Sequence, residues 1–191
     1  MRKVIVSVYT TLNGVMSPVD WPFPYASAER GKYAHDLLCE ADALVMGRET
    51  YEIFAAVWPE RTTADDGPGE AGSADHINSM AKYVASTTLQ HLTWNNSHLI
   101  TGDVAEEVAN MKQQPGQSIV LYGAGPVAHK LLQLGLVDEI RVWVYPLVIG
   151  VTEKTKRLFD DASDIPLLNL VETRAFDSGI VVLSYQPHRT T

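Results

Sequence analysis

The chain has little cysteine and no long apolar run, and each absence narrows what it can be. Cys39 is the only cysteine among 191 residues, so an internal disulfide is impossible and a cysteine-built zinc site is excluded. No apolar stretch approaches the length of a membrane span, and the N-terminus becomes polar too soon for a signal peptide. We therefore expect a cytoplasmic protein with no membrane partner.

Positive charge is also scarce. The sequence has 15 Lys and Arg against 23 Asp and Glu, a formal net charge of -8, which disfavours nonspecific binding to nucleic acid. It contains no G-x-S-x-G elbow, no H-E-x-x-H pair and no G-x-x-x-x-G-K-[ST] loop, and its histidines do not fall at metal-ligand spacing. We expect neither a nucleic-acid partner nor a metal site.

The length favours one domain over residues 1–191. A chain of 191 residues can build one sizeable α/β core and is short for two. Residues 59–75 hold several acidic side chains and almost no large apolar one, so they cannot contribute much to a core. We expect them to form a flexible, exposed acidic insertion.

The stretch from 118 to 150 is typical of a strand, a glycine turn, a helix and a second strand in succession. Its first apolar run, 119–122, fits a strand buried on both faces. The N–H groups of a helix that begins after a small-residue turn suit a phosphate. A dinucleotide pyrophosphate site and a tight turn that binds nothing both fit this segment. The residues that would form the site are Gly123, Ala124, Gly125, Pro126 and Val127.

A second junction of the same kind follows a strand predicted over 42–46, before a helix predicted over 49–58. Gly47 permits close approach of a ligand to the backbone. Arg48 offers a forked positive charge to a phosphate, and the Thr50 hydroxyl offers a further hydrogen bond. The alternative is that Arg48 is a surface residue paired with Glu49 or Glu52.

These segments resemble the dihydrofolate reductase-like superfamily, specifically the reductase domain at the C-terminus of bifunctional riboflavin-biosynthesis proteins and its stand-alone relatives. The matching motifs are A-L-V-M-G-R-E-T-Y-E at 43–52, K-Y-V at 82–84 before Ser86 and Thr87, and G-L-V-D-E at 135–139. The resemblance implies a three-layer α/β fold with a mostly parallel, twisted sheet and an antiparallel C-terminal strand. It also places Ser86 and Thr87 at the adenosine end of NADPH and implies a homodimer. The zinc deaminase half of the bifunctional proteins is missing, because its P-C-x-x-C signature needs two cysteines.

By this resemblance the chain is an NADPH-dependent reductase, similar to pyrimidine reductases, that acts on a small heterocyclic or carbonyl compound. Hydride transfer would occur near Tyr9 and Thr10. Asp20 is the candidate catalytic proton donor, in an aromatic and proline-rich loop over 15–25, although an exposed turn aspartate fits that position equally well. The rival hypothesis is a non-catalytic, dimeric nucleotide-binding or sensor protein on the same fold.

Overall fold

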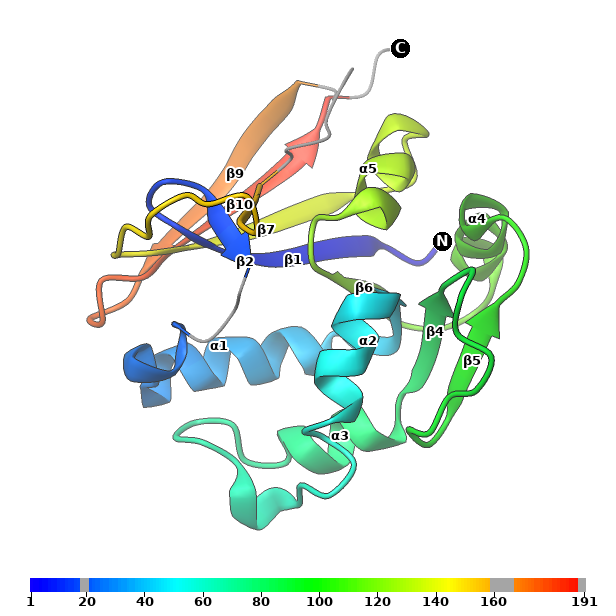
Figure 1. Ribbon diagram of the computed structural model, residues 1–191, viewed down its shortest axis with the longest axis horizontal. Coiled ribbons are helices and arrows are strands. Elements are labelled where there is room, and N and C mark those ends of the chain that lie inside the picture. The colour runs from blue at the N-terminus through cyan, green and yellow to red at the C-terminus, as the bar shows by residue number, and fades with distance from the viewer. Residues whose placement is uncertain (18–20, 159–166, 189–191) are drawn as a thin grey trace.

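The computed structural model describes residues 1–17, 21–158 and 167–188. Eight strands form one sheet in the order β5-β4-β3-β6-β1-β7-β10-β9 (Figure 1). Strands β5 to β7 in this order run parallel, β10 pairs antiparallel with β7, and β9 pairs antiparallel with β10. The strands of this sheet are β1 (Val4–Thr11), β3 (Ala41–Gly47), β4 (Ala81–Ala85), β5 (Ser97–Ile100), β6 (Ser118–Tyr122), β7 (Glu139–Tyr145), β9 (Leu168–Ala175) and β10 (Val181–Pro187). A separate ribbon pairs β2 (Val15–Ser17) with β8 (Lys156–Arg157).

Helices cover both faces of the sheet. Side chains of α4 and α5 pack into the core on one face, and side chains of α1, α2 and α3 pack on the other (Figure 1). The helices are α1 (Ala28–Cys39), α2 (Arg48–Ala55), α3 (Ser73–Ser79), α4 (Val104–Gln113) and α5 (Pro126–Gln133), with short 3-10 turns η1 (Phe23–Tyr25) and η2 (Thr63–Asp65). Within the described ranges, no helix is both long and apolar enough to cross a membrane. The three-layer α/β fold with a mostly parallel sheet and an antiparallel C-terminal strand is thus confirmed.

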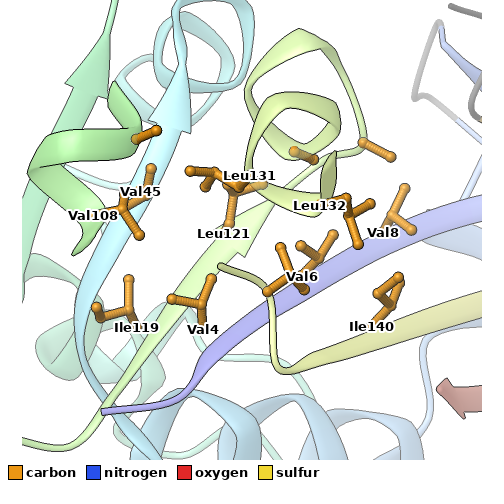
Figure 2. Close-up of a cluster of buried hydrophobic side chains, with 14 of the residues drawn as sticks. Val4, Val6, Val8, Val45, Val108, Ile119, Leu121, Leu131, Leu132 and Ile140 are labelled. Carbon is orange, nitrogen blue, oxygen red and sulfur yellow. The ribbon is translucent and has the colours of Figure 1, made fainter. Parts of the chain in front are cut away.

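Strand β1 explains why the sheet needs helices on both sides. Val4, Val6 and Val8 point into the cluster beneath α4 and α5 (Figure 2), whereas Ile5 points into the cluster beneath α1 to α3. A strand buried on both faces reads as a continuous apolar run, because neither face meets water. Each such side chain stabilises the fold by about 1.5–3 kcal/mol relative to its exposed state.

Helix α2 ends earlier than the sequence predicts. The expected helix extended to residue 58, but α2 ends at Ala55. The N–H groups of Val57 and Trp58 both donate to the Phe54 carbonyl, at 3.0 and 2.9 Å, which tightens the last turn. The Trp58 side chain packs beside the buried cluster under α1 to α3 instead of continuing the helix.

The second half of the 59–75 segment contacts helix α1. It passes below α1 (Figure 1), and the backbone contact is close: a Cβ built on Gly31 would lie 2.0 Å from the Pro68 carbonyl oxygen. Glu70 Oε1 lies 2.8 Å from Arg30 Nη1. The Asp66 carboxylate accepts hydrogen bonds from the N–H groups of Gly72 and Ala74 at the start of α3. Low apolar content did not prevent packing, since glycine backbone and an ion pair make the contact.

Candidate functional site

Neighbouring parallel strands end along one edge of the sheet, and every predicted cofactor residue follows one of these ends. Gly47 on β3 lies opposite Ala85 on β4, and Val45 lies opposite Leu121 on β6. In open α/β sheets, ligands bind outside the carboxyl ends of the strands. The structure therefore brings residues 47–50, 86–87 and 123–127 to the same edge.

The junction of β3 and α2 leaves a helix end available to a ligand. Gly47 is the N-cap of α2, with φ of -78° and ψ of 168°, and it supplies no side-chain cap. The first N–H groups of a helix have no partner inside the helix. Thr50 lies half-buried in the first turn of α2, so its hydroxyl stands beside these free donors.

The junction of β6 and α5 has the same construction. Gly123 has a φ of 92°, which favours glycine, and its N–H donates to the Ser7 carbonyl at 3.0 Å. Ala124 is buried at 4% exposure and anchors the turn in the core. Gly125 caps α5 without a side-chain hydrogen bond, and Pro126 occupies the first helical position as predicted.

The two junctions face each other. A Cβ built on Gly123 would lie 3.4 Å from Thr50 Oγ1, and a Cβ built on Gly47 would lie 3.8 Å from Val127 Cγ2. Two helix N-termini therefore open next to each other, with glycine backbone between them. Backbone N–H groups and the positive ends of two helix dipoles are a suitable environment for an anion.

Ser86 and Thr87 follow β4 beside the first junction. The Ser86 hydroxyl oxygen accepts hydrogen bonds from the N–H groups of Thr88 and Leu89, at 3.2 and 3.0 Å, and so closes its own turn. Thr87 is exposed. Of the two hydroxyls, that of Thr87 is the more accessible to an adenosine phosphate.

The basic side chains at this edge form ion pairs. Arg48 Nη1 lies 3.2 Å from Glu52 Oε1, with both side chains 47% exposed, which is the surface pairing that the sequence left open. Lys156 from β8 lies beside the same helix end, with its Nζ 2.6 Å from Glu49 Oε1. Exposed pairs of this kind contribute only about 0–1 kcal/mol, so either cation can exchange its carboxylate for a phosphate.

Asp20, the predicted proton donor, lies outside the described residues, which omit 18–20. Its neighbour Trp21 is 8% exposed and packs edge-on against Tyr145, with ring centroids 5.0 Å apart. Tyr25 packs on the same ring at 5.6 Å. The described part of the aromatic loop thus covers the core.

Sequence reasoning missed a polar cluster near the C-terminal end of β1. Arg30 on α1 donates to the Tyr9 hydroxyl at 2.9 Å and pairs with Glu70. Burial raises the pKa of Tyr9 and of Tyr145, and the positive charge of Arg30 opposes both increases. The only sequence signal was a tyrosine on the same face of β1 as Ile5 and Ser7.

Comparison with known proteins identifies the family. The RibD C-terminal domain family matches this chain over residues 2–182. The chain belongs to this family. It is also 29% identical over 184 residues to the uncharacterized protein YyaP of Bacillus subtilis, in a match that covers 96% of this chain and 94% of YyaP.

Solved structures of RibD-type proteins share the fold. A putative riboflavin biosynthesis protein from Shewanella has a TM-score of 0.63 at 18% identity, covering 98% of this chain and 99% of that one. A pyrimidine reductase-like protein from Corynebacterium diphtheriae has a TM-score of 0.62 at 16% identity, in a match that covers 99% of this chain and 93% of that one. A deaminase and uracil reductase from Thermotoga maritima has a TM-score of 0.64 at 13% identity, in a match that covers 98% of this chain but 57% of that one. These likenesses establish the dihydrofolate reductase-like fold of this RibD-type domain.

Proposed function

We propose that this RibD-type domain is an NADPH-dependent reductase that transfers hydride to a small heterocyclic or carbonyl substrate. The observation that carries the proposal is the pair of facing helix N-termini at Gly47 and Gly125, neither of which has a side-chain cap. Family membership over residues 2–182 supports the same conclusion.

The residues at this edge fit the cofactor. The first N–H groups of α5 and the turn at Gly123, Ala124 and Gly125 would hold the pyrophosphate. Gly125 leaves open space, since a Cβ built there meets no heavy atom within 4 Å. The cofactor supplies a hydride when bound.

Side chains would bind the adenosine end of the cofactor. Arg48 would pair with the 2′-phosphate in place of Glu52, and Thr87 and Ser86 would add hydroxyl contacts. A cation here, without a carboxylate dedicated to the ribose, favours NADPH over NADH. The protein is further proposed to act as a cytoplasmic homodimer on a small-molecule substrate, without a nucleic-acid or membrane partner.

The alternative is a non-catalytic nucleotide-binding or sensor protein, because the anion site alone does not require turnover. Two measurements separate the hypotheses. Thermal unfolding with NADPH or NADH reports binding, since a ligand specific to the native state raises the midpoint. Loss of NADPH absorbance with a panel of carbonyl, imine and heterocyclic compounds reports reduction.

A rise in midpoint with NADPH, together with oxidation by a panel member, supports the reductase. Stabilisation by NADPH without oxidation by any panel member favours the sensor. No stabilisation by either nucleotide contradicts both proposals.

A further inference from the structure

Tyr9 occupies a distinctive position on the central strand. It is the only residue of β1 that is not fully buried, and it lies beyond the last β1 residue paired with β6, since Ser7 is opposite Tyr122. The neighbouring backbone is the glycine turn, because the Gly123 N–H donates to the Ser7 carbonyl. Tyr9 is thus half-buried, on a strand whose backbone adjoins the proposed cofactor edge.

The Tyr9 hydroxyl has a dedicated partner. Arg30 Nη2 donates to its oxygen at 2.9 Å, and the guanidinium carbon lies 5.6 Å from the centre of the Tyr9 ring. A phenol that accepts a hydrogen bond from a guanidinium keeps its own O–H group to donate. The arrangement therefore presents a polarised hydrogen-bond donor.

Arg30 is itself held in place by Glu70. The two side chains are 14% and 18% exposed, and Arg30 Nη1 lies 2.8 Å from Glu70 Oε1. Partly buried, hydrogen-bonded pairs of this kind are costly to break. This pair draws residues from α1 and from the 59–75 segment to one phenol.

The cluster contains a second buried phenol. Tyr145 is 0% exposed, and its hydroxyl lies within hydrogen-bonding reach of the Tyr9 hydroxyl and the Arg30 guanidinium. Tyr145 lies close to Tyr9, with ring centroids 5.3 Å apart.

The charge of the cluster indicates which ligand it accepts. The Arg30 cation is balanced by the Glu70 carboxylate, so the cluster has no net charge to attract an anion. Burial raises the pKa of Tyr9, and Glu70 adds to the increase while Arg30 opposes it. The phenol therefore holds its proton at neutral pH, next to a cation that stabilises the phenolate once the proton leaves.

We propose that the Tyr9 hydroxyl donates a hydrogen bond, and then a proton, to the heteroatom of a neutral C=O or C=N substrate, with Arg30 and Glu70 as positioning residues. This inference rests on the proposed reductase function. The carbon of the double bond gains the hydride that NADPH supplies, and the heteroatom gains the Tyr9 proton. The phenolate beside Arg30 then recovers a proton from water, so one NADPH and one proton are consumed for each C=O or C=N bond reduced.

A purely structural role is the alternative. The ion pair of Arg30 and Glu70 docks the 59–75 segment on α1, and that docking does not require the Tyr9 hydroxyl. Tyr9→Phe separates the two roles, because it keeps the ring that packs edge-on against Trp143 at 5.3 Å and removes the hydroxyl, which is both the proposed donor and the acceptor for Arg30 Nη2.

The test compares Tyr9→Phe with the matched control Tyr83→Phe. Tyr83 is also a half-buried strand tyrosine, on β4, three strands away from β1. We expect Tyr9→Phe to lower kcat/KM for carbonyl or imine compounds by about 10²–10⁴-fold, the usual contribution of a general acid. The NADPH dissociation constant should stay at the wild-type value. The unfolding midpoint of Tyr9→Phe should fall somewhat, because Arg30 Nη2 loses its acceptor, but the variant should remain folded at the assay temperature. Tyr83→Phe should leave all three quantities unchanged.

The pH profile tests the positioning residues. The charged or titratable groups facing Tyr9 are Arg30, Glu70, Tyr145 and Tyr122. Glu70→Gln removes a charge that raises the pKa of Tyr9, so activity should begin to fall at a lower alkaline pH. Arg30→Met removes a charge that lowers this pKa, so the fall should move to higher pH. A structural role predicts loss of activity without these opposite shifts, and thermal unfolding shows whether either variant remains folded.

The outcomes distinguish this inference from the proposed function. Full activity in Tyr9→Phe overturns the inference and leaves the reductase intact. Wild-type protein that binds NADPH but reduces no carbonyl or imine compound also overturns it, because the inference commits to that class. Protein that does not bind NADPH refutes the proposed function, and the Tyr9 inference fails with it.

Discussion

Replacing Gly125 with Asp should strengthen helix α5 and weaken NADPH binding. Gly125 has a φ of -84° and a ψ of -163°, the extended backbone of an N-cap, and it precedes a proline, which favours the same region. A side chain there is free of clashes, since a built Cβ meets no heavy atom within 4 Å. The substitution therefore introduces a carboxylate at the proposed pyrophosphate site without disturbing the turn.

The expected magnitudes have opposite signs. Asp, Asn and Ser are better caps than Gly by a few tenths of a kcal/mol, and a negative charge interacts favourably with the helix dipole. Two like charges roughly 5 Å apart repel by about 3 kcal/mol at an effective dielectric constant near 20. After screening by salt, about 1.5–3 kcal/mol remains, which corresponds to ~10–100-fold weaker binding.

The assay is a titration of NADPH against wild type, Gly125→Asp and Gly125→Asn, with urea unfolding of each. Asn has nearly the shape of Asp and caps equally well, so it controls for side-chain bulk. We expect Gly125→Asn to bind NADPH much more tightly than Gly125→Asp, while both are at least as stable as the wild type. Equal affinity in the two variants would show that no phosphate lies at the start of α5.

Two further predictions concern charged side chains. Arg48→Ala should weaken NADPH binding by ~10–100-fold, the value of one charge-assisted hydrogen bond, and leave NADH binding almost unchanged. Glu52→Gln should tighten NADPH binding slightly, because it frees Arg48. Equal losses of affinity for both cofactors in Arg48→Ala would show that Arg48 does not contact the 2′-phosphate. Burial lowers the pKa of Lys82 to about 8, below the ~10.4 of an unfolded lysine. The unfolded chain therefore holds this proton more strongly than the folded protein does. The free energy of unfolding should accordingly rise between about pH 8 and pH 10. Lys82→Met should lack this rise in urea unfolding, and an identical profile in both proteins would mean that the backbone carbonyls around Lys82 hold the proton as firmly as water does.

The two strand-to-helix junctions at the edge proposed to bind the cofactor could be predicted from the sequence, because their information is local. A buried strand, a small-residue turn and a helix follow one another within about a dozen residues at both junctions, and parallel strands bring their carboxyl ends to one edge by geometry. The sequence predicted a helix after each glycine turn, and α2 and α5 begin directly after Gly47 and Gly125. The resemblance to a known superfamily supplied the order of the segments, which periodicity alone does not fix.

The polar cluster could not be predicted, because its members are distant in the sequence. Arg30 is 21 residues from Tyr9 and 40 from Glu70, and charge patterns report only pairs within a few residues, such as Arg48 and Glu52. Glu70 was assigned to an exposed insertion because that segment lacks apolar residues. Its contact with α1 depends instead on glycine backbone at Gly31 and Gly69, where a side chain would collide.

This contrast suggests how the two halves of the site divide their roles. The edge proposed to bind the cofactor is built from backbone groups and helix dipoles, which depend on the fold and tolerate change in most side chains. The cluster around Tyr9 is built from side chains contributed by β1, α1, β7 and the 59–75 segment, so a single substitution in any of these can change its charge or its donors. A Glu70→Gln variant would leave Arg30 without its counter-charge, and the cluster would then attract anionic substrates that the paired form does not. Substrate choice in this RibD-type domain is therefore expected to follow the sequence of these four segments, while cofactor binding follows the fold.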